Sequence, residues 1–199
     1  IHGEEDSQLT YLRTQNLSEK AQSIYQLSSR AASKAKLKTF NLDLGCEWVR
    51  NESVSRLVGE GATSEMLAVS VPEKSQEFDM RTLQLHEQRN TSSNLLYKNA
   101  LYDDSKTTFA GMIVVEDEAH QTDAYQTCRN LLMSDTSEAN SMPGLEVKAD
   151  QVRCSHGATC TPVSKDELFY LQSRGVKQPA ARLLYTSPSP LDQRGSRTP

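Results

Sequence analysis

The sequence predicts an all-β core, and two observations support this prediction. At least six short runs between positions 40 and 154 alternate apolar and polar residues, which is typical of strands with one buried face. No convincing helical period interrupts these runs, so βαβ units are not expected. The runs cover residues 40–45, 53–58, 66–71, 82–87, 109–115 and 145–154.

The connections between the runs leave the topology open. They are poor in Asn-Gly and Asp-Gly pairs, which are the strongest hairpin signal, so a meander of tight hairpins is not indicated. A β-solenoid winds similar strands into stacked coils and uses looser corners, but no strict repeat is visible. The pattern alone supports a β-sandwich and a β-solenoid equally.

The segment before these runs has a different period. Apolar residues recur at helical spacing in residues 17–36, so this segment taken alone predicts an amphipathic helix. These residues are Leu17, Ala21, Ile24, Leu27 and Ala31.

The end of the chain contains helix signals. Ser164 and Glu167 form a capping box ahead of an apolar face that includes Phe169, and Gly175 is placed to end this helix in a left-handed conformation. A second short helix is predicted over residues 178–184, with Pro179 in its first turn. Residues 185–199 lack an apolar period and resemble translated sequencing-adapter sequence. We therefore expect a core at 1–163, the start of a helical domain at 164–184, and a disordered, non-native tail at 185–199.

The composition excludes several functional classes. Hydrophobic residues make up 36% of the 199 residues and the mean hydropathy is -0.62, which suits either disorder or a fold whose core is spread thinly along an axis. The net charge of -4 comes from interspersed acids and bases, so neither a nucleic-acid surface nor a basic membrane patch is expected. No run approaches the roughly 18 apolar residues of a membrane span, and no signal peptide is visible. The four cysteines are therefore interpreted as reduced thiols of an intracellular protein.

Three longer stretches resemble a known family. They are residues 97–135 (including QTDAYQTCRNLLMSD), residues 144–159 (GLEVKADQVRCSHGAT) and residues 166–176 (DELFYLQSRGV). Together and in this order they resemble the SufB/SufD family of the SUF system, which assembles iron–sulfur clusters. The wording is closer to the SufD branch than to the SufB branch, and the similarity covers roughly residues 9–184.

The resemblance implies a right-handed parallel β-helix followed by a small helical domain. It favours the solenoid over the sandwich, and it assigns residues 17–36 to β-helix coils instead of a helix. It also implies a scaffold that pairs with SufB, is coupled to the SufC ATPase, and shares a transient iron–sulfur cluster with SufB. In the family the helical domain continues past position 184, so weakened SufC binding is expected of this chain. The implied location is the cytoplasm or the plastid stroma.

The motif VRCSHGAT carries the first candidate site residues, Cys154 and His156. On a strand, positions i and i+2 share one face, and a thiolate with a neutral imidazole can bind iron. Taken alone, this spacing is more often chance packing. The resemblance links His156 to cluster assembly, with Cys154 as a secondary candidate for transient iron binding. Gly157 stands where SufB has an acidic residue, which agrees with a SufD role.

Cys128 in YQTCRNLL departs from the SufD pattern towards SufB. It is either an extra thiol near the cluster-assembly interface or a small buried hydrophobic residue, and we favour the second interpretation. Cys46 is expected in the core and Cys160 in a structural role. His86 and His120 have no ligand companions nearby and are interpreted as surface or turn residues.

The competing function is a secreted-type β-helix carbohydrate-active enzyme, either a lyase or a hydrolase. Such enzymes use carboxylates, arginines or calcium in a groove, and no convincing carboxylate pair is found here. An independent Cys/His metal enzyme would need three or more well-placed ligands. No P-loop sequence is present, so nucleotide is expected on the partner and not on this chain. The preferred reading is a non-catalytic scaffold.

Overall fold

The computed structural model describes residues 1–162, 169–170 and 172–175, and in this part of the chain it contains twelve strands. Each strand of the core runs for eight to ten residues, apart from the first, which has two. The strands are β1 (His2–Gly3), β2 (Gln8–Gln15), β3 (Gln22–Ala31), β4 (Lys36–Asp43), β5 (Trp48–Leu57), β6 (Thr63–Ser70), β7 (Glu77–His86), β8 (Ser92–Leu101), β9 (Lys106–Val115), β10 (Asp123–Leu132), β11 (Glu138–Val147) and β12 (Arg153–Pro162).

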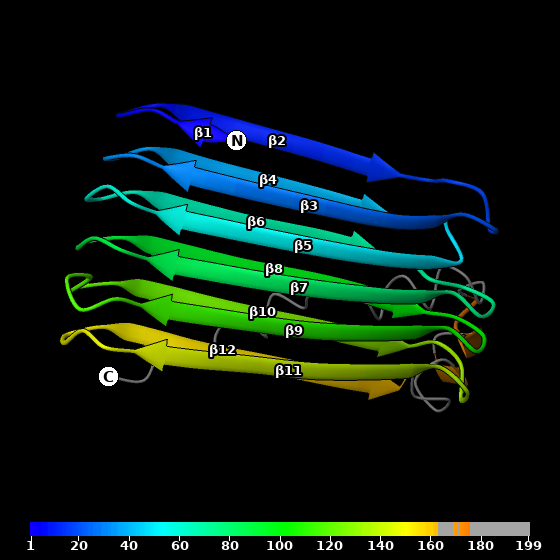
Figure 1. Cartoon of the computed structure of the whole chain (residues 1–199). Coiled ribbons are helices and arrows are strands. Elements are labelled where there is room, and N and C mark those ends of the chain that lie inside the picture. Colours follow the sequence, from blue (N-terminus) through cyan, green and yellow to red (C-terminus); the bar gives the residue numbers. More distant parts are fainter. Residues whose placement is uncertain (163–168, 171, 176–199) are drawn as a thin grey trace. The chain divides into compact units, whose positions relative to one another are not determined.

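The strands form a parallel β-solenoid with two facing sheets. Odd-numbered strands follow one another in one six-stranded sheet and even-numbered strands in the other. Every strand pairs in parallel with the strand two elements later, as in the pairing of Trp48 with Glu77 and of Glu77 with Lys106. One turn therefore takes roughly 30 residues, within the period of solenoid repeats. Figure 1 shows the coils stacked from β1 and β2 at one end to β11 and β12 at the other. The predicted parallel β-helix is confirmed.

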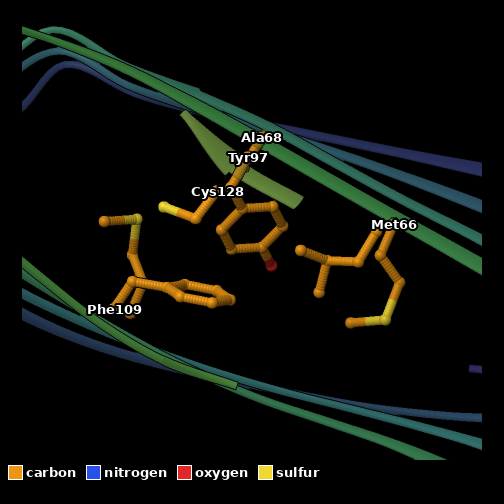
Figure 2. Packing of buried hydrophobic residues seen from close by; sticks show 7 residues of the cluster. Met66, Ala68, Tyr97, Phe109 and Cys128 are labelled. Atoms are coloured by element: carbon orange, nitrogen blue, oxygen red, sulfur yellow. The ribbon is translucent and has the colours of Figure 1, made fainter. Parts of the chain in front are cut away.

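Alternating side chains fill the space between the two sheets. Strand β7 is typical, because Phe78, Met80, Thr82, Gln84 and His86 are all buried. The largest apolar cluster lies between the sheets and contains Met66, Ala68, Met80, Leu95, Tyr97, Phe109 and Cys128 (Figure 2). Many inward positions are polar, which explains how a chain with few hydrophobic residues still forms a solenoid.

The corners before the even-numbered strands share one backbone feature. A residue with positive φ stands there in every turn. At Asp6, Lys34, Gly61 and Asn90 the amide of this residue donates to a carbonyl in the corresponding corner of the next turn. Lys34 N, for example, donates to Glu60 O at 2.9 Å, and Asn90 N donates to His120 O at 2.9 Å. These hydrogen bonds continue the ladder through the corner, so the turns stack without a break. The residues with positive φ are Asp6, Lys34, Gly61, Asn90, Gln121 and Gln151.

The helix predicted over residues 17–36 from spacing alone is wrong. The central part of this segment is strand β3, in agreement with the family resemblance. Leu27 and Ala31 are buried between the sheets, but Ile24 is 71% exposed on the outer face. The helical spacing arose because exposed and buried apolar residues were counted together, although a strand places them on opposite faces.

Two further details of the strand prediction are corrected. The run at residues 145–154 is not one strand, because β11 ends at Val147 and β12 begins at Arg153. Strands β8 and β10 were missed entirely. Their inward positions include Ser93, Asn99 and Gln126, which are polar and buried, so the apolar alternation that marks a strand is weak there.

The chain divides into two compact units, Ile1–Thr161 and Pro162–Pro199. In the second unit, Phe169, Tyr170, Gln172 and Ser173 are helical, and Gly175 has a φ of 83°. This is the left-handed conformation predicted for the residue that ends the helix. The capping-box residues, the predicted helix at 178–184 and the tail at 185–199 lie outside the described residues. In the described part of the chain, no helix has the length and apolar character needed to cross a membrane.

Candidate functional site

Strand β12 carries both residues of the predicted Cys–x–His pair. It is the terminal strand of its sheet and pairs only with β10, so its other edge has no neighbour among the described strands. Strand β11 occupies the same terminal position in the facing sheet. Among the described residues no further strand covers this end of the solenoid, and Leu145 and Val147 on β11 are 38% and 43% exposed. An open end with unpaired backbone groups is a surface suited to another β-structure.

Cys154 is the more protected member of the pair. It packs against a buried apolar cluster that includes Ile113, Val115 and Ala124. Burial raises the pKa of the Cys154 thiol, although a hydrogen bond with the backbone of Ala124 acts in the opposite direction. The Cys154 thiol is therefore protonated at neutral pH, and it becomes a metal ligand only when a metal displaces its proton.

His156 lies two positions further along β12 and is exposed. Strand geometry puts it on the same face as Cys154. Within the described part of the chain it makes no hydrogen bond or ion pair. The structure thus supports the placement of the pair on one strand face, with His156 accessible and Cys154 mostly covered.

Cys128 lies apart from this pair, inside the apolar cluster of Figure 2. Its Sγ accepts from Asn99 Nδ2 at 3.6 Å and donates to Asn130 Oδ1 at 3.8 Å. Burial raises the pKa of Cys128 to about 11. A fully buried, protonated thiol behaves as a small hydrophobic side chain, and this is the interpretation of Cys128 that the sequence favoured.

Asn130 lies between Cys128 and a second thiol, Cys160, for which the sequence analysis expected only a structural role. Its Nδ2 donates to the Sγ of Cys160 at 3.5 Å and to the hydroxyl of Ser141 at 3.1 Å. Cys160 is exposed on β12, and its Sγ donates to the carbonyl of Ala139 at 3.5 Å. Cys160 shares strand parity with Cys154 and His156, and this even spacing was the signal that could have identified it.

His86 is not a surface residue, and the sequence interpretation is corrected here. It is fully buried, and its Nδ1 and Nε2 lie 2.8 Å from the hydroxyls of Thr91 and Ser93. The Thr91 hydroxyl donates to Gln88 O, so it accepts from Nδ1–H, which assigns the neutral Nδ1-protonated tautomer. Burial lowers the pKa of His86 to about 4. By contrast, His120 does lie in a turn, as expected.

The remaining predicted positions are also located. Cys46 is buried with Val49 and Phe78, which confirms its place in the core. At Gly157 an added Cβ would meet only Tyr125 Oη, at 3.9 Å, so a side chain fits there. Among the described residues, no group of three or more His, Cys, Asp or Glu side chains is arranged to hold a metal ion. Cys154 and His156 alone do not complete the ligand set of an iron site.

The chain was compared with known proteins once this geometry was established. A family model described as SUF system FeS cluster assembly, SufBD core domain, matches residues 1–187. The iron-sulfur cluster assembly protein SufD of Escherichia coli (strain K12) is 36% identical over 139 residues, which cover 70% of this chain and 33% of that protein.

Two further relatives carry the same family description. An iron-sulfur cluster assembly SufBD family protein of Synechocystis is 29% identical over 180 residues, which cover 90% of this chain and 40% of that protein. A SufBD family protein of Mycobacterium leprae is 32% identical over 158 residues, covering 75% and 40% respectively. The chain therefore spans about a third to two fifths of the length of these relatives.

Proposed function

Because the chain belongs to the SufBD family of the SUF iron–sulfur cluster assembly system, we propose that it acts as the SufD-type scaffold of that system. In this role it pairs with SufB through the β-solenoid and works with the SufC ATPase. The nascent cluster forms where the two solenoids meet. The proteins of this family are generally non-catalytic assembly factors, and this chain performs no turnover of its own.

The observation that carries the proposal is the position of His156. It is exposed on β12, the last strand of its sheet, at the open end of the solenoid. A second solenoid that pairs with this edge would bring its own side chains directly against the imidazole. An imidazole in this position is able to bind iron or to accept a proton.

The incomplete ligand set supports a shared site. Among the described residues, half-buried Cys154 and exposed His156 form a pair of ligands on β12, and no group of three or more ligands is present. Iron–sulfur clusters are held by about four protein ligands, mostly thiolates. The partner is therefore proposed to supply the majority of them, which agrees with Gly157 standing where SufB has an acidic residue.

The experiment is anaerobic reconstitution of the SufB–SufC–SufD complex carrying His156→Ala. Because the chain spans only part of its relatives, residues 1–184 are placed within a homologous full-length SufD. We expect the complex to assemble normally while its iron and sulfide content falls. His2→Ala, which changes an exposed histidine at the opposite end of the solenoid, is the matched control and should keep the content of the parent.

The readouts separate the alternatives. Unchanged iron and sulfide in His156→Ala, in a complex of normal stoichiometry, would remove this residue from the site. Loss of complex formation would show instead that His156 is needed for subunit pairing. The same measurement on Cys154→Ala ranks the second candidate, which we expect to lower the content less than His156→Ala because its thiol is covered.

A further inference from the structure

Two of the four thiols in this chain meet at one carboxamide. Asn130, on β10, has its Oδ1 3.8 Å from Cys128 Sγ and its Nδ2 3.5 Å from Cys160 Sγ. Cys128 is on the same strand as Asn130, and Cys160 is on the neighbouring strand β12. The two sulfurs therefore lie on either side of a single amide group that can rotate about its side-chain bonds.

Two uncharged oxygen atoms of the facing sheet lie close to the Asn130 carboxamide and to Cys160. The hydroxyl of Ser141 accepts from Asn130 Nδ2 at 3.1 Å, and the carbonyl of Ala139 accepts from Cys160 Sγ at 3.5 Å. Both residues belong to β11. Access comes from one side, because Cys160 is exposed while Cys128 is fully buried. The cluster thus has an inner thiol, an outer thiol and polar atoms between them.

We infer that Cys128 and Cys160 form a two-thiolate binding site for a soft metal ion. Thiolates select soft ions such as Cu(I) over hard ones, and two sulfurs with nearby neutral oxygens suit a low coordination number. Binding of a divalent ion to both thiols forms two metal–sulfur bonds and releases two protons to solvent. Rotation of the Asn130 carboxamide away from the sulfurs lets them approach the ion.

The other two cysteines provide internal controls. Cys46 packs with Val49 and Phe78, and Cys154 packs against the cluster of Ile113 and Ala124. In the described part of the chain, neither of these two residues contacts a second thiol. The inference does not depend on the proposed assembly function, since it concerns this chain alone.

Cadmium is the probe, added to the reduced full chain under anaerobic conditions. We expect one Cd(II) per chain by native mass spectrometry, together with the ultraviolet charge-transfer absorption of thiolate-bound cadmium. Cys160→Ser should weaken binding at least about tenfold and abolish this absorption. Cys46→Ser, which changes a thiol packed in the core with Val49 and Phe78, should bind as the parent does.

Cys128→Ala should show the same loss as Cys160→Ser. If Cys128→Ala does not fold, as judged by circular dichroism, Cys160→Ser decides the question, because its exposed side chain can be changed without disturbing the core. Binding by Cys160→Ser with the affinity of the parent would overturn the inference. So would loss of binding in Cys154→Ser, which would place the metal at the Cys154–His156 pair instead.

Discussion

Arg13 on β2 donates to the buried carboxylate of Asp43 on the neighbouring strand β4 at 2.8 Å, so the ion pair joins two successive coils of the solenoid. Asn51 Nδ2 donates to the other Asp43 oxygen at 2.6 Å, and the Arg13 guanidinium stacks 4.0 Å from the centre of the Tyr25 ring. Burial raises the pKa of Asp43 more than Arg13 lowers it. Arg13 and Asn51 therefore offset only part of the cost of burying this carboxylate.

Replacing Arg13 by leucine should destabilise the solenoid by about 3 kcal/mol, because it leaves an uncompensated buried carboxylate. Urea unfolding measures this loss. The double variant Arg13→Leu with Asp43→Asn should recover part of it, since the unpaired charge is then absent. If the double variant is as unstable as Arg13→Leu, the loss comes from packing against Tyr25 and not from the charge.

His86 predicts a pH dependence of stability. Its pKa is lowered to about 4 in the folded chain from the ordinary value of 6.5, because the charged ring is buried. The unfolded chain therefore takes up a proton below about pH 6.5, while the folded chain does so only near pH 4. The folded state loses stability as pH falls through this window, by about 2 kcal/mol between pH 7.5 and pH 5.

His86→Gln isolates this contribution, because glutamine cannot be protonated. Urea unfolding of both proteins at several pH values should show a smaller loss for His86→Gln between pH 7.5 and pH 5. Only the slopes of stability against pH are compared, because the substitution itself also changes the stability at pH 7.5. Equal slopes would mean that His86 does not remain neutral in the folded chain.

The sequence predicted the strand core well but reached the solenoid only through family motifs. Period-two alternation identified strands where the inward residues are apolar, as at Ile113 and Val115 in β9. It failed where buried positions hold Asn99 or Gln126, since burial of polar groups depends on hydrogen bonds made between turns. His86 was wrongly predicted at the surface for the same reason, because its partners Thr91 and Ser93 become neighbours only in the folded coil.

The candidate site could also be predicted only in part from the sequence. Local spacing was sufficient to place Cys154 and His156 on one strand face, because strand geometry is set by neighbouring residues. The proximity of Cys128 and Cys160 could not be read from spacing. It depends on the pairing of β10 with β12 and on the length of the connection between them.

Two glycines of one corner should respond differently to alanine. At Gly61 an added Cβ would meet only Lys34 Cγ, at 3.5 Å, but the φ of 72° is unfavourable for alanine. Gly61→Ala should therefore cost about 1 kcal/mol. At Gly59 the Cβ would lie 2.0 Å from the backbone nitrogen of Ser33, so the turns of the solenoid must separate. Thermal unfolding should show a markedly larger loss for Gly59→Ala, and equal losses would contradict this account.

Gly157 and Gly111 form the matching test near the candidate site. An added Cβ at Gly157 would meet only Tyr125 Oη, at 3.9 Å, whereas at Gly111 it would lie 2.5 Å from Gln126 Oε1 and 2.6 Å from Phe109 Cζ. Gly157→Ala should leave stability unchanged or raise it by up to about 1 kcal/mol, because alanine restricts the unfolded chain. Gly111→Ala should lower stability by about 1–3 kcal/mol through overpacking. Urea unfolding of the two variants checks both values.

If Gly157→Ala is as stable as the parent, then the glycine is not required by the fold. Gly157→Glu, which introduces the acidic residue of SufB at this position, then becomes an interpretable variant in the reconstituted complex. A large loss of stability in Gly157→Ala would show the opposite, namely that the glycine is needed for packing at the end of the solenoid. In that case its difference from SufB would reflect structure and not the division of chemistry between the two subunits.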